Sequence, residues 1–348
     1  MAITNFEKLL SAERVNAFVR EIDYTPTRID QLFPAVKTPD MTAKTIYGAN
    51  GLPVVASIHA FDTVTEIASR DDIQLSEVQK TLIKRQIPLR EELILMLNHP
   101  RTQAELGQTA KQVFDDIGNM VLSVKTKARV MAAEALSTGT VTTQNENNLT
   151  GVTVDYQLPV NHFDTLSGTS AWTDDAATPM NDLQEWMAQI VADGGERPAY
   201  AITSQAVISA LVQHVSIRNA IYGAGSERVL NPGELNAYFA SMGLPQFIAF
   251  DEKYRQQKRD GSYEVKSYID PNKVILVPNG SVGQQEYGPT AEELELTADP
   301  SNQIISQQHV VAQVYRTPDP VARWTKAVGT CMPSFARANE VFIATVKE

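Results

Sequence analysis

The most regular stretch of the chain, residues 104–136, reads AELGQTAKQVFDDIGNMVLSVKTKARVMAAEAL. Its apolar residues recur at steps of three and four, the period of an amphipathic α-helix: Leu106, Ala110, Val113, Phe114, Ile117, Met120, Val121, Val124, Ala128, Met131 and Ala135. At a rise of about 1.5 Å per residue, one uninterrupted helix would be about 50 Å long, far above the usual three to four turns. We therefore predict a single long helix that ends at Gly139, with a polar linker over 138–150.

Extended segments are predicted before this helix. Residues 54–61 (VVASIHAF) and 81–89 (TLIKRQIPL) are rich in β-forming residues, and we interpret them as two arms of a long hairpin. The charged stretch 66–73 between them is the expected tip. A connection of this length is unusual in a compact domain unless it binds something, so we expect a protruding loop.

The N-terminal part is predicted to be an arm. Residues 5–21 place apolar side chains at roughly helical spacing over a short length. Residues 23–53 contain four prolines, which remove backbone donors and block a helix, so an extended arm or loop is expected there.

A different composition begins near residue 150, where predicted strands and helices alternate as in a small α/β lobe. Thr178 and Pro179 mark the start of one helix and Gly194-Gly195 its end. A hairpin is predicted over 253–269, because Asp260-Gly261 is a two-residue turn signal. The other predicted elements are helices over 204–214 and 233–242 and strands over 199–202, 246–250, 273–278, 310–316, 321–328 and 340–346.

Composition and charge exclude several classes of protein. The chain of 348 residues is 43% hydrophobic and 20% charged, which is globular composition and excludes collagen-like, coiled-coil and wholly disordered chains. Its net charge is −11 and no run of cations interrupts the acidic background, so strong nucleic-acid binding is not expected. A single cysteine fits a reducing compartment, and we find neither a signal-peptide pattern nor a membrane-spanning apolar run. We expect a soluble cytoplasmic product.

Residues that could carry catalysis do not form a motif. Phosphate-binding glycine loops and His-Glu-x-x-His are absent, and the five histidines are scattered. Ser281, in Asn279-Gly-Ser-Val-Gly, lacks the first glycine and the following helix of a nucleophile elbow, so we interpret it as part of a strand-exit turn. Cys331 is expected to be a small buried apolar residue. We predict no enzymatic activity, no cofactor and no metal.

Clustered charges are interpreted as solvated surface. This applies to Asp71-Asp72, Asp174-Asp175 and Glu292-Glu293-x-Glu295, which could otherwise be acid/base pairs or ion sites. The cations of Lys253-Tyr-Arg-Gln-Gln-Lys-Arg lie on one arm of a predicted hairpin, where exposed charge protects an edge strand. A surface hairpin is preferred to a nucleic-acid contact.

The order of these segments, together with three local patterns, resembles a known family. The patterns are Tyr254 through Asp260-Gly261 to Asp270-Pro-Asn-Lys-Val-Ile-Leu-Val-Pro, then Thr317-Pro-Asp-Pro-Val-Ala-Arg-Trp-Thr, and Trp172 through Asp182-Leu-Gln-Glu-Trp. They resemble segments of the major capsid proteins of lambda-like tailed bacteriophages, the capsid protein E family. The resemblance implies an α+β chain with the Hong Kong 97-type capsid fold.

The resemblance also implies a domain organisation. Residues 1–45 would be the N-terminal arm and 46–89 an extended β-hairpin loop that overlaps a neighbouring subunit. The peripheral domain would comprise 90–149 and 286–333, with a spine helix over 101–137. The axial domain, an α/β lobe, would comprise 150–285 and 334–348.

The implied function is that of a major capsid protein. Hexamers and pentamers of the chain would form an icosahedral shell around double-stranded phage DNA. The shell would be assembled as a procapsid in the host bacterial cytoplasm and matured into the virion. A separate scaffold protein, a cement (decoration) protein and a portal would be partners, and no membrane would be involved. The implied contacts between subunits are Glu66, Arg70, Asp71, Asp72, Lys84, Arg85, Arg316, Asp319 and Arg323.

One departure from some relatives concerns covalent crosslinking through a lysine on the extended loop. The expected tip around Arg70-Asp71-Asp72 has no lysine, so we predict no self-crosslinking and reliance on a cement protein. Two alternatives stay open at this point: another virion protein, such as a tail-tube or portal subunit, or a soluble α/β enzyme without a recognisable motif.

Overall fold

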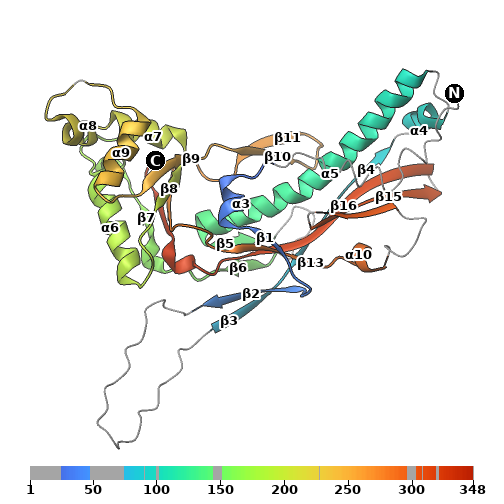
Figure 1. Ribbon diagram of the computed structural model, residues 1–348, viewed down its shortest axis with the longest axis horizontal. Coiled ribbons are helices and arrows are strands. Elements are labelled where there is room, and N and C mark those ends of the chain that lie inside the picture. The colour runs from blue at the N-terminus through green and yellow to red at the C-terminus, as the bar shows by residue number, and fades with distance from the viewer. Residues whose placement is uncertain are drawn as a thin grey trace, which may run out of the picture. The chain divides into compact units, whose positions relative to one another are not determined.

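The computed structural model describes residues 25–47, 74–89, 91–98, 102–143, 151–226, 228–295, 303–307, 309–318 and 321–347 (Figure 1). The chain divides into two compact units, each built from three separate stretches of sequence. Unit 1 comprises Met1–Ala43, Val78–Ala132 and Gln284–Ser334. Unit 2 comprises Lys44–Glu77, Ala133–Gly283 and Phe335–Glu348. Both contain helices and strands, in agreement with the predicted α+β class.

The predicted long helix is present as α5, Gln103–Thr138. Its apolar stripe is buried as the periodicity predicts, with Ile117, Val124 and Met131 fully inaccessible to solvent. Gly139 follows the helix with a φ of +72°, a left-handed conformation that glycine adopts without strain and that ends the helix.

Unit 1 is organised around one sheet, in the order β1-β13-β16-β15-β14, and β4, which lies off this path, also pairs with β16. Its strands are β1 (Ala35–Lys37), β4 (Thr81–Leu89), β13 (Gln284–Gly288), β14 (Gln303–Gln307), β15 (Val310–Pro318) and β16 (Val321–Ser334). Its short helices are α3 (Arg28–Leu32), α4 (Glu91–Asn98) and α10 (Ala291–Glu295). Strand β16 is the longest strand among the described residues and pairs antiparallel with β4, β13 and β15.

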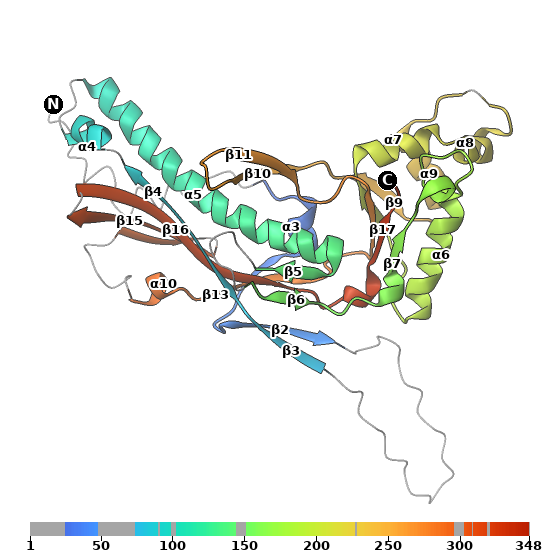
Figure 2. The same ribbon diagram turned by 180° about the vertical axis from the view of Figure 1, so that it is seen from behind.

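The part of α5 in unit 1 packs against this sheet, as both ribbon views show (Figures 1 and 2). The helix and the sheet approach closely at Gly329 of β16, where an added Cβ would lie 2.9 Å from the side chain of Val124. Glycine therefore allows the strand backbone to approach the helix.

The hairpin prediction applies only in part to the described residues. Strands β2 (Thr42–Tyr47) and β3 (Gln74–Gln79) form a two-stranded sheet of their own. Strand β4 has the alternating exposure expected of a strand and pairs with β16 over Arg323–Cys331. Its expected partner, 54–61, and the expected tip, 66–73, lie outside the described residues, as does the predicted arm over 5–21.

A short helix corrects the prediction that 23–53 is an extended arm or loop. In α3, the backbone N–H and hydroxyl of Thr27 donate to Asp30, a capping arrangement that starts the helix. Ile29 and Leu32 are each 1% exposed, and Arg129 of α5 donates to Asp30 at 2.7 Å. Burial and this ion pair stabilise a helix that is too short to form alone.

Unit 2 contains a five-stranded sheet in the order β7-β17-β12-β8-β9. Its strands are β7 (Phe163–Thr165), β8 (Tyr200–Thr203), β9 (Gln246–Ala249), β12 (Lys273–Val277) and β17 (Phe342–Thr345). Its helices are α6 (Pro179–Ala192), α7 (Gln205–Gln213), α8 (Val215–Tyr222) and α9 (Pro232–Ser241), with 3-10 turns at Val160–His162, Gly168–Ser170 and Ala338–Glu340. The predicted α/β lobe is therefore present, although α8 and β7 were not predicted.

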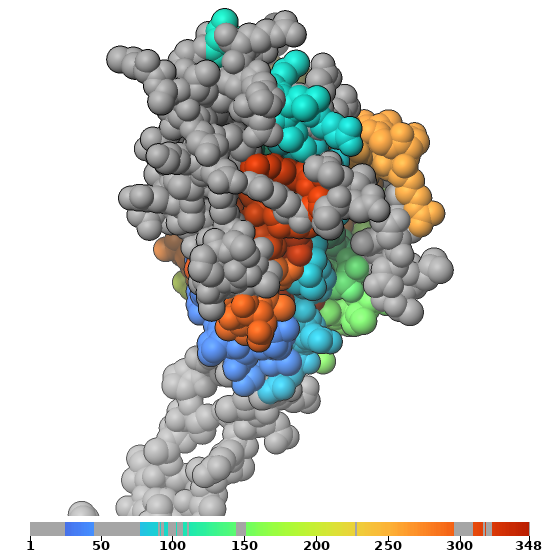
Figure 3. All heavy atoms as spheres, turned by 90° about the vertical axis from the view of Figure 1, so that its right-hand side faces the viewer, coloured from blue at the N-terminus to red at the C-terminus, as the bar shows by residue number. Residues whose placement is uncertain are grey.

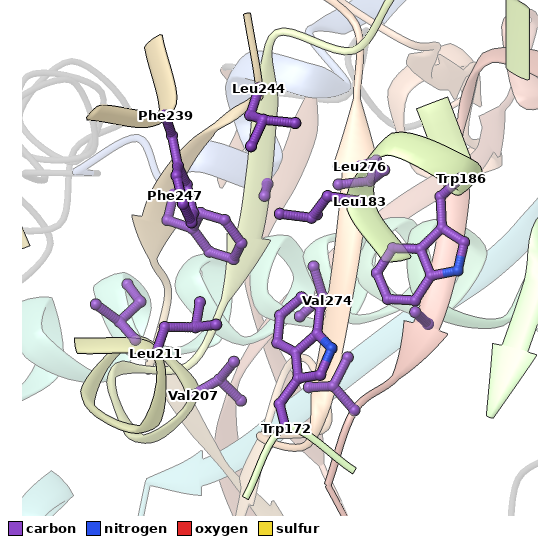
Figure 4. Packing of buried hydrophobic residues seen from close by; sticks show 14 of the residues in the cluster. Trp172, Leu183, Trp186, Val207, Leu211, Phe239, Leu244, Phe247, Val274 and Leu276 are labelled. Carbon is purple, nitrogen blue, oxygen red and sulfur yellow. The ribbon is translucent and has the colours of Figure 1, made fainter. Parts of the chain in front are cut away.

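Side chains from these helices meet the sheet in one core (Figure 4). Two tryptophans stack within it, with 5.6 Å between the ring centroids of Trp172 and Trp186. Each indole N–H donates to a carboxylate, Trp172 to Asp182 at 2.8 Å and Trp186 to Asp164 at 2.9 Å. The apolar rings are thus buried while their polar atoms keep partners.

Two further two-stranded sheets belong to unit 2. Strands β5 (Thr140–Thr142) and β6 (Thr153–Asp155) pair directly after α5. Strands β10 (Lys253–Gln257) and β11 (Tyr263–Ser267) form the predicted hairpin, and Gly261 in its turn has a φ of +85°. Within the described part of the chain, no helix has the length and hydropathy to cross a membrane.

Candidate functional site

The chain leaves unit 1 after Ala43 and re-enters it at Val78, so the root of the β2–β3 hairpin lies on this unit. Lys80, between β3 and β4, is at the centre of that root. Its side chain is 0% exposed, and its backbone N–H donates to the Met41 carbonyl at 2.9 Å. The outgoing and returning chains are therefore joined directly.

The buried ammonium of Lys80 has three oxygen partners. It donates to the hydroxyl of Thr38 and to the carbonyl of Asp40, the latter at 2.7 Å. Glu286 of β13 supplies the counter-charge, with 3.6 Å between Nζ and Oε2. A buried cation needs such a complete set of partners, so this node fixes the chain at the root of the hairpin.

A glycine makes room for the node. An added Cβ at Gly288 would lie 3.1 Å from the Lys80 side chain and 3.2 Å from the Asp40 carbonyl. Any larger residue would displace the lysine or the chain that it holds.

A second charged node joins α10 to the sheet. The carboxylate of Glu292 accepts hydrogen bonds on Oε1 from Lys326 of β16 at 2.6 Å and Lys84 of β4 at 2.9 Å. Burial opposes the ionisation of Glu292, yet the hydrogen bonds from Lys326 and Lys84 outweigh it and lower the pKa of the carboxyl to about 2. The group is therefore a carboxylate throughout the physiological range.

The next residue of α10 extends this arrangement to β1. Glu293 pairs with Lys37, and Figure 3 shows α10 in orange against the blue segment that contains β1. Successive glutamates of one short helix thus bind lysines from three strands. These interactions correct the prediction that the 292–295 cluster is simply solvated, because the side chain of Glu292 is only 7% exposed.

The predicted subunit contacts fall into two groups. Glu66, Arg70, Asp71, Asp72 and Asp319 lie outside the described residues, as does the side chain of Arg316. Lys84 and Arg85 lie on β4, opposite Val328 and Ala327 of β16, and Arg316 and Arg323 are direct partners in the β15–β16 register. The sheet thus gathers residues that are far apart in the sequence.

Other residues important at this site were missed. Lys80, Glu286 and Lys326 show no local pattern that distinguishes them from exposed charges. Lys80 follows a polar strand, and β13 reads as a polar turn, QQEYG. The pairing of Lys80 with Glu286 depends on a fold that brings together residues more than two hundred positions apart, and Lys326 meets Glu292 across 34 positions.

Among the residues that the structure describes, those considered for catalysis do not assemble into a site. The turn at Ser281 leads into β13 rather than into a helix, so it does not present a nucleophile as an elbow does. Across the described ranges, no group of three or more His, Cys, Asp or Glu residues is placed to hold a metal ion. Cys331 is buried, as predicted, and burial raises its pKa to about 12.

A family model provides the decisive comparison. The model for phage major capsid protein E matches residues 11–346. The chain belongs to the phage major capsid protein E family. As a member of this family it is a shell-forming virion protein, which confirms the resemblance inferred from the order of its segments.

Solved structures agree with this member of the capsid protein E family at the level of the fold. The crystal structure of the putative capsid protein of an Escherichia coli CFT073 prophage is 14% identical, with a TM-score of 0.63, 97% of this chain covered and 99% of that one. A phage-related protein from Bordetella bronchiseptica RB50 is 11% identical, with a TM-score of 0.55 and 96% of each chain covered. The fold is the Hong Kong 97-type capsid fold. No curated protein matches the chain in sequence.

Proposed function

We propose that this chain is the major head protein of a tailed phage, whose hexamers and pentamers close into an icosahedral shell around double-stranded DNA. The observation that carries the proposal is the family match over 11–346, which includes both units and the hairpin. It favours a capsid subunit over a tail-tube or portal subunit and over an enzyme.

In this proposal unit 1 is the peripheral domain and unit 2 the axial domain around the capsomer axes. The hairpin that begins with β2 and ends with β3 overlaps a neighbouring subunit, and the Lys80 node holds its root in a defined direction. Pre-organisation of this kind reduces the entropy lost on association. Scaffold, cement and portal proteins are the expected partners, and assembly takes place in the bacterial cytoplasm.

Assembly of the purified chain tests the proposal. We expect closed shells or capsomer rings by negative-stain microscopy, together with fast-sedimenting species by analytical ultracentrifugation, with or without a co-expressed scaffold. A folded monomer at every concentration, with and without scaffold, would contradict it.

A variant with a shortened hairpin tests the role of this segment in assembly. Residues 48–73 are replaced by a short Asn-Gly turn that joins β2 to β3, a connection that suits antiparallel strands. We expect a folded chain with the thermal stability of the natural one and no shells. Normal shells from this variant would exclude the overlapping role of the hairpin.

Denaturing gels of mature particles test the crosslinking prediction. Because residues 62–79 contain no lysine, we expect single chains. Ladders of covalent oligomers would contradict it.

A further inference from the structure

The β10–β11 hairpin has two faces of different character. The register pairs Arg255 with Val265 and Gln257 with Tyr263, so these four residues share one face. The other face contains Tyr254 and Glu264. A two-stranded sheet is marginally stable by itself, so contacts on its faces determine whether it stays ordered.

On the face of Tyr254, the aromatic ring and the charged side chains have partners within the chain. The ring of Tyr254 packs on that of Tyr268, with 5.0 Å between centroids. The carboxylate of Glu264 lies 3.6 Å from Lys258 and 3.8 Å from Lys266, so opposite charges compensate one another on this side.

The opposite face, defined by Lys253, Arg255, Gln257, Tyr263 and Val265, is called here the basic face. All five residues are exposed, Tyr263 by 55% and Val265 by 61%. The Arg255 guanidinium lies 5.5 Å from the centroid of the Tyr263 ring. Among the described residues, no carboxylate lies within 4.0 Å of the charged nitrogens of Lys253 or Arg255. The cations on the Tyr254 face are therefore paired with a carboxylate, whereas in the described part of the chain those on the basic face are not.

The charge of the chain indicates the partner. Residues 253–267 hold five cations and two carboxylates, whereas the whole chain has a net charge of −11. A second copy thus approaches as an acidic body, and like-charged copies need complementary patches of this kind to associate. The exposed tyrosine and valine favour burial against protein over contact with DNA phosphates, which would leave the valine in water.

We propose that the basic face docks on an acidic surface of a second copy of this chain during shell formation. The inference rests on the proposed capsid function and assigns one surface to it. Docking would cover the apolar residues of the basic face and neutralise Lys253 and Arg255.

Two double variants with equal changes in net charge test the proposal. Lys253→Gln/Arg255→Gln removes two cations from the basic face, and Lys258→Gln/Lys266→Gln removes two from the compensated face of the same hairpin. The assembly rate is measured by light scattering at several salt concentrations, after far-UV circular dichroism and urea unfolding have shown that both variants are folded. We expect the first variant to assemble about tenfold more slowly, with a weaker dependence on salt, and the control to stay within about twofold of the natural chain.

Equal rates for the two variants, with the natural chain assembling, would overturn the docking inference and leave the capsid function intact. Failure of the natural chain to assemble would count against the capsid function itself.

Val265→Ser probes the apolar part without changing charge, and we expect it to slow assembly about threefold. In fluorescence anisotropy with a short DNA duplex, we expect no binding that depends on Lys253 and Arg255. Such binding, together with normal assembly of the double variant, would assign the face to nucleic acid and overturn the inference.

Discussion

The ammonium of Lys326 on β16 lies 2.6 Å from Oε1 of Glu292 on α10, and Lys84 on β4 donates to the same oxygen at 2.9 Å. One carboxylate thus joins α10 to two neighbouring strands. Because its pKa is lowered from 4.5 to about 2, its stabilising effect is complete above pH 4.5 and is lost as the pH falls toward 2.

We expect Glu292→Gln to lower the free energy of unfolding at pH 7 by about 2 kcal/mol, with part of the interaction screened because Lys84 is 43% exposed. Urea unfolding of the unassembled chain between pH 7 and pH 2.5 measures the effect. The difference between variant and natural chain should shrink as the pH falls below 4.5. Glu295→Gln, on the exposed side of the same helix, is the control and should change little. A difference that stays constant down to pH 2.5 would contradict the role of the charge.

Lys80→Met tests the node at the root of the hairpin. The variant leaves Glu286 buried without its cation and the Asp40 carbonyl without its donor, so we expect a loss of about 3 kcal/mol in the free energy of unfolding. Adding Glu286→Gln should recover part of this loss. Lys44→Met is the matched control, because Lys44 is 48% exposed and lies 3.9 Å from Glu77, a geometry worth about 0.5 kcal/mol or less. An equal loss in both single variants would rule out a special role for Lys80.

The contact between α5 and β16 predicts that one substitution on the strand and one on the helix partly offset each other's loss of stability. Gly329→Ala places a Cβ against Val124 and should cost about 1–3 kcal/mol, and Val124→Ala should cost about 2 kcal/mol by leaving a cavity. Because the new methyl group occupies that cavity, the double variant should lose at least about 1 kcal/mol less than the sum of the single losses. Strict additivity in thermal or urea unfolding would show that the two sites do not meet.

The burial of Cys331 can be tested by chemical labelling of its thiol. Burial raises the pKa of its thiol to about 12, so the reactive thiolate is scarce at pH 8 and the sulfur is also inaccessible. We expect a thiol-specific disulfide reagent to leave the native chain unmodified and to label one thiol per chain in urea. Rapid stoichiometric labelling of the native chain would contradict the packing of β16.

The elements that could be predicted from the sequence are those with local signals. The apolar stripe predicts α5, Asp260-Gly261 predicts the β10–β11 turn, and Pro179 predicts the start of α6. Strand β13 could not be found in this way because Gln285 and Glu286 read as surface, although they are 5% and 9% exposed. Lys80 supplies the counter-charge for Glu286 there, and that pairing depends on the fold rather than on neighbours in the sequence.

The same reason limits prediction of the site. The sequence favours a solvated Glu292 because adjacent glutamates usually are, and its two lysines come from strands that only the folded sheet brings together. The family resemblance supplied the fold and the role of the chain through the order of segments. It could not supply these side-chain partners.

The division of both units among separate stretches of sequence has a consequence for synthesis. The sheet of unit 1 is centred on β16, at Val321–Ser334, and the sheet of unit 2 has β17, at Phe342–Thr345, between β7 and β12. A chain still growing on the ribosome therefore has a gap in each sheet until almost its last described residues have been made. Products that stop before Val321 would lack both strands, so neither sheet could form completely and such products would not supply a folded subunit.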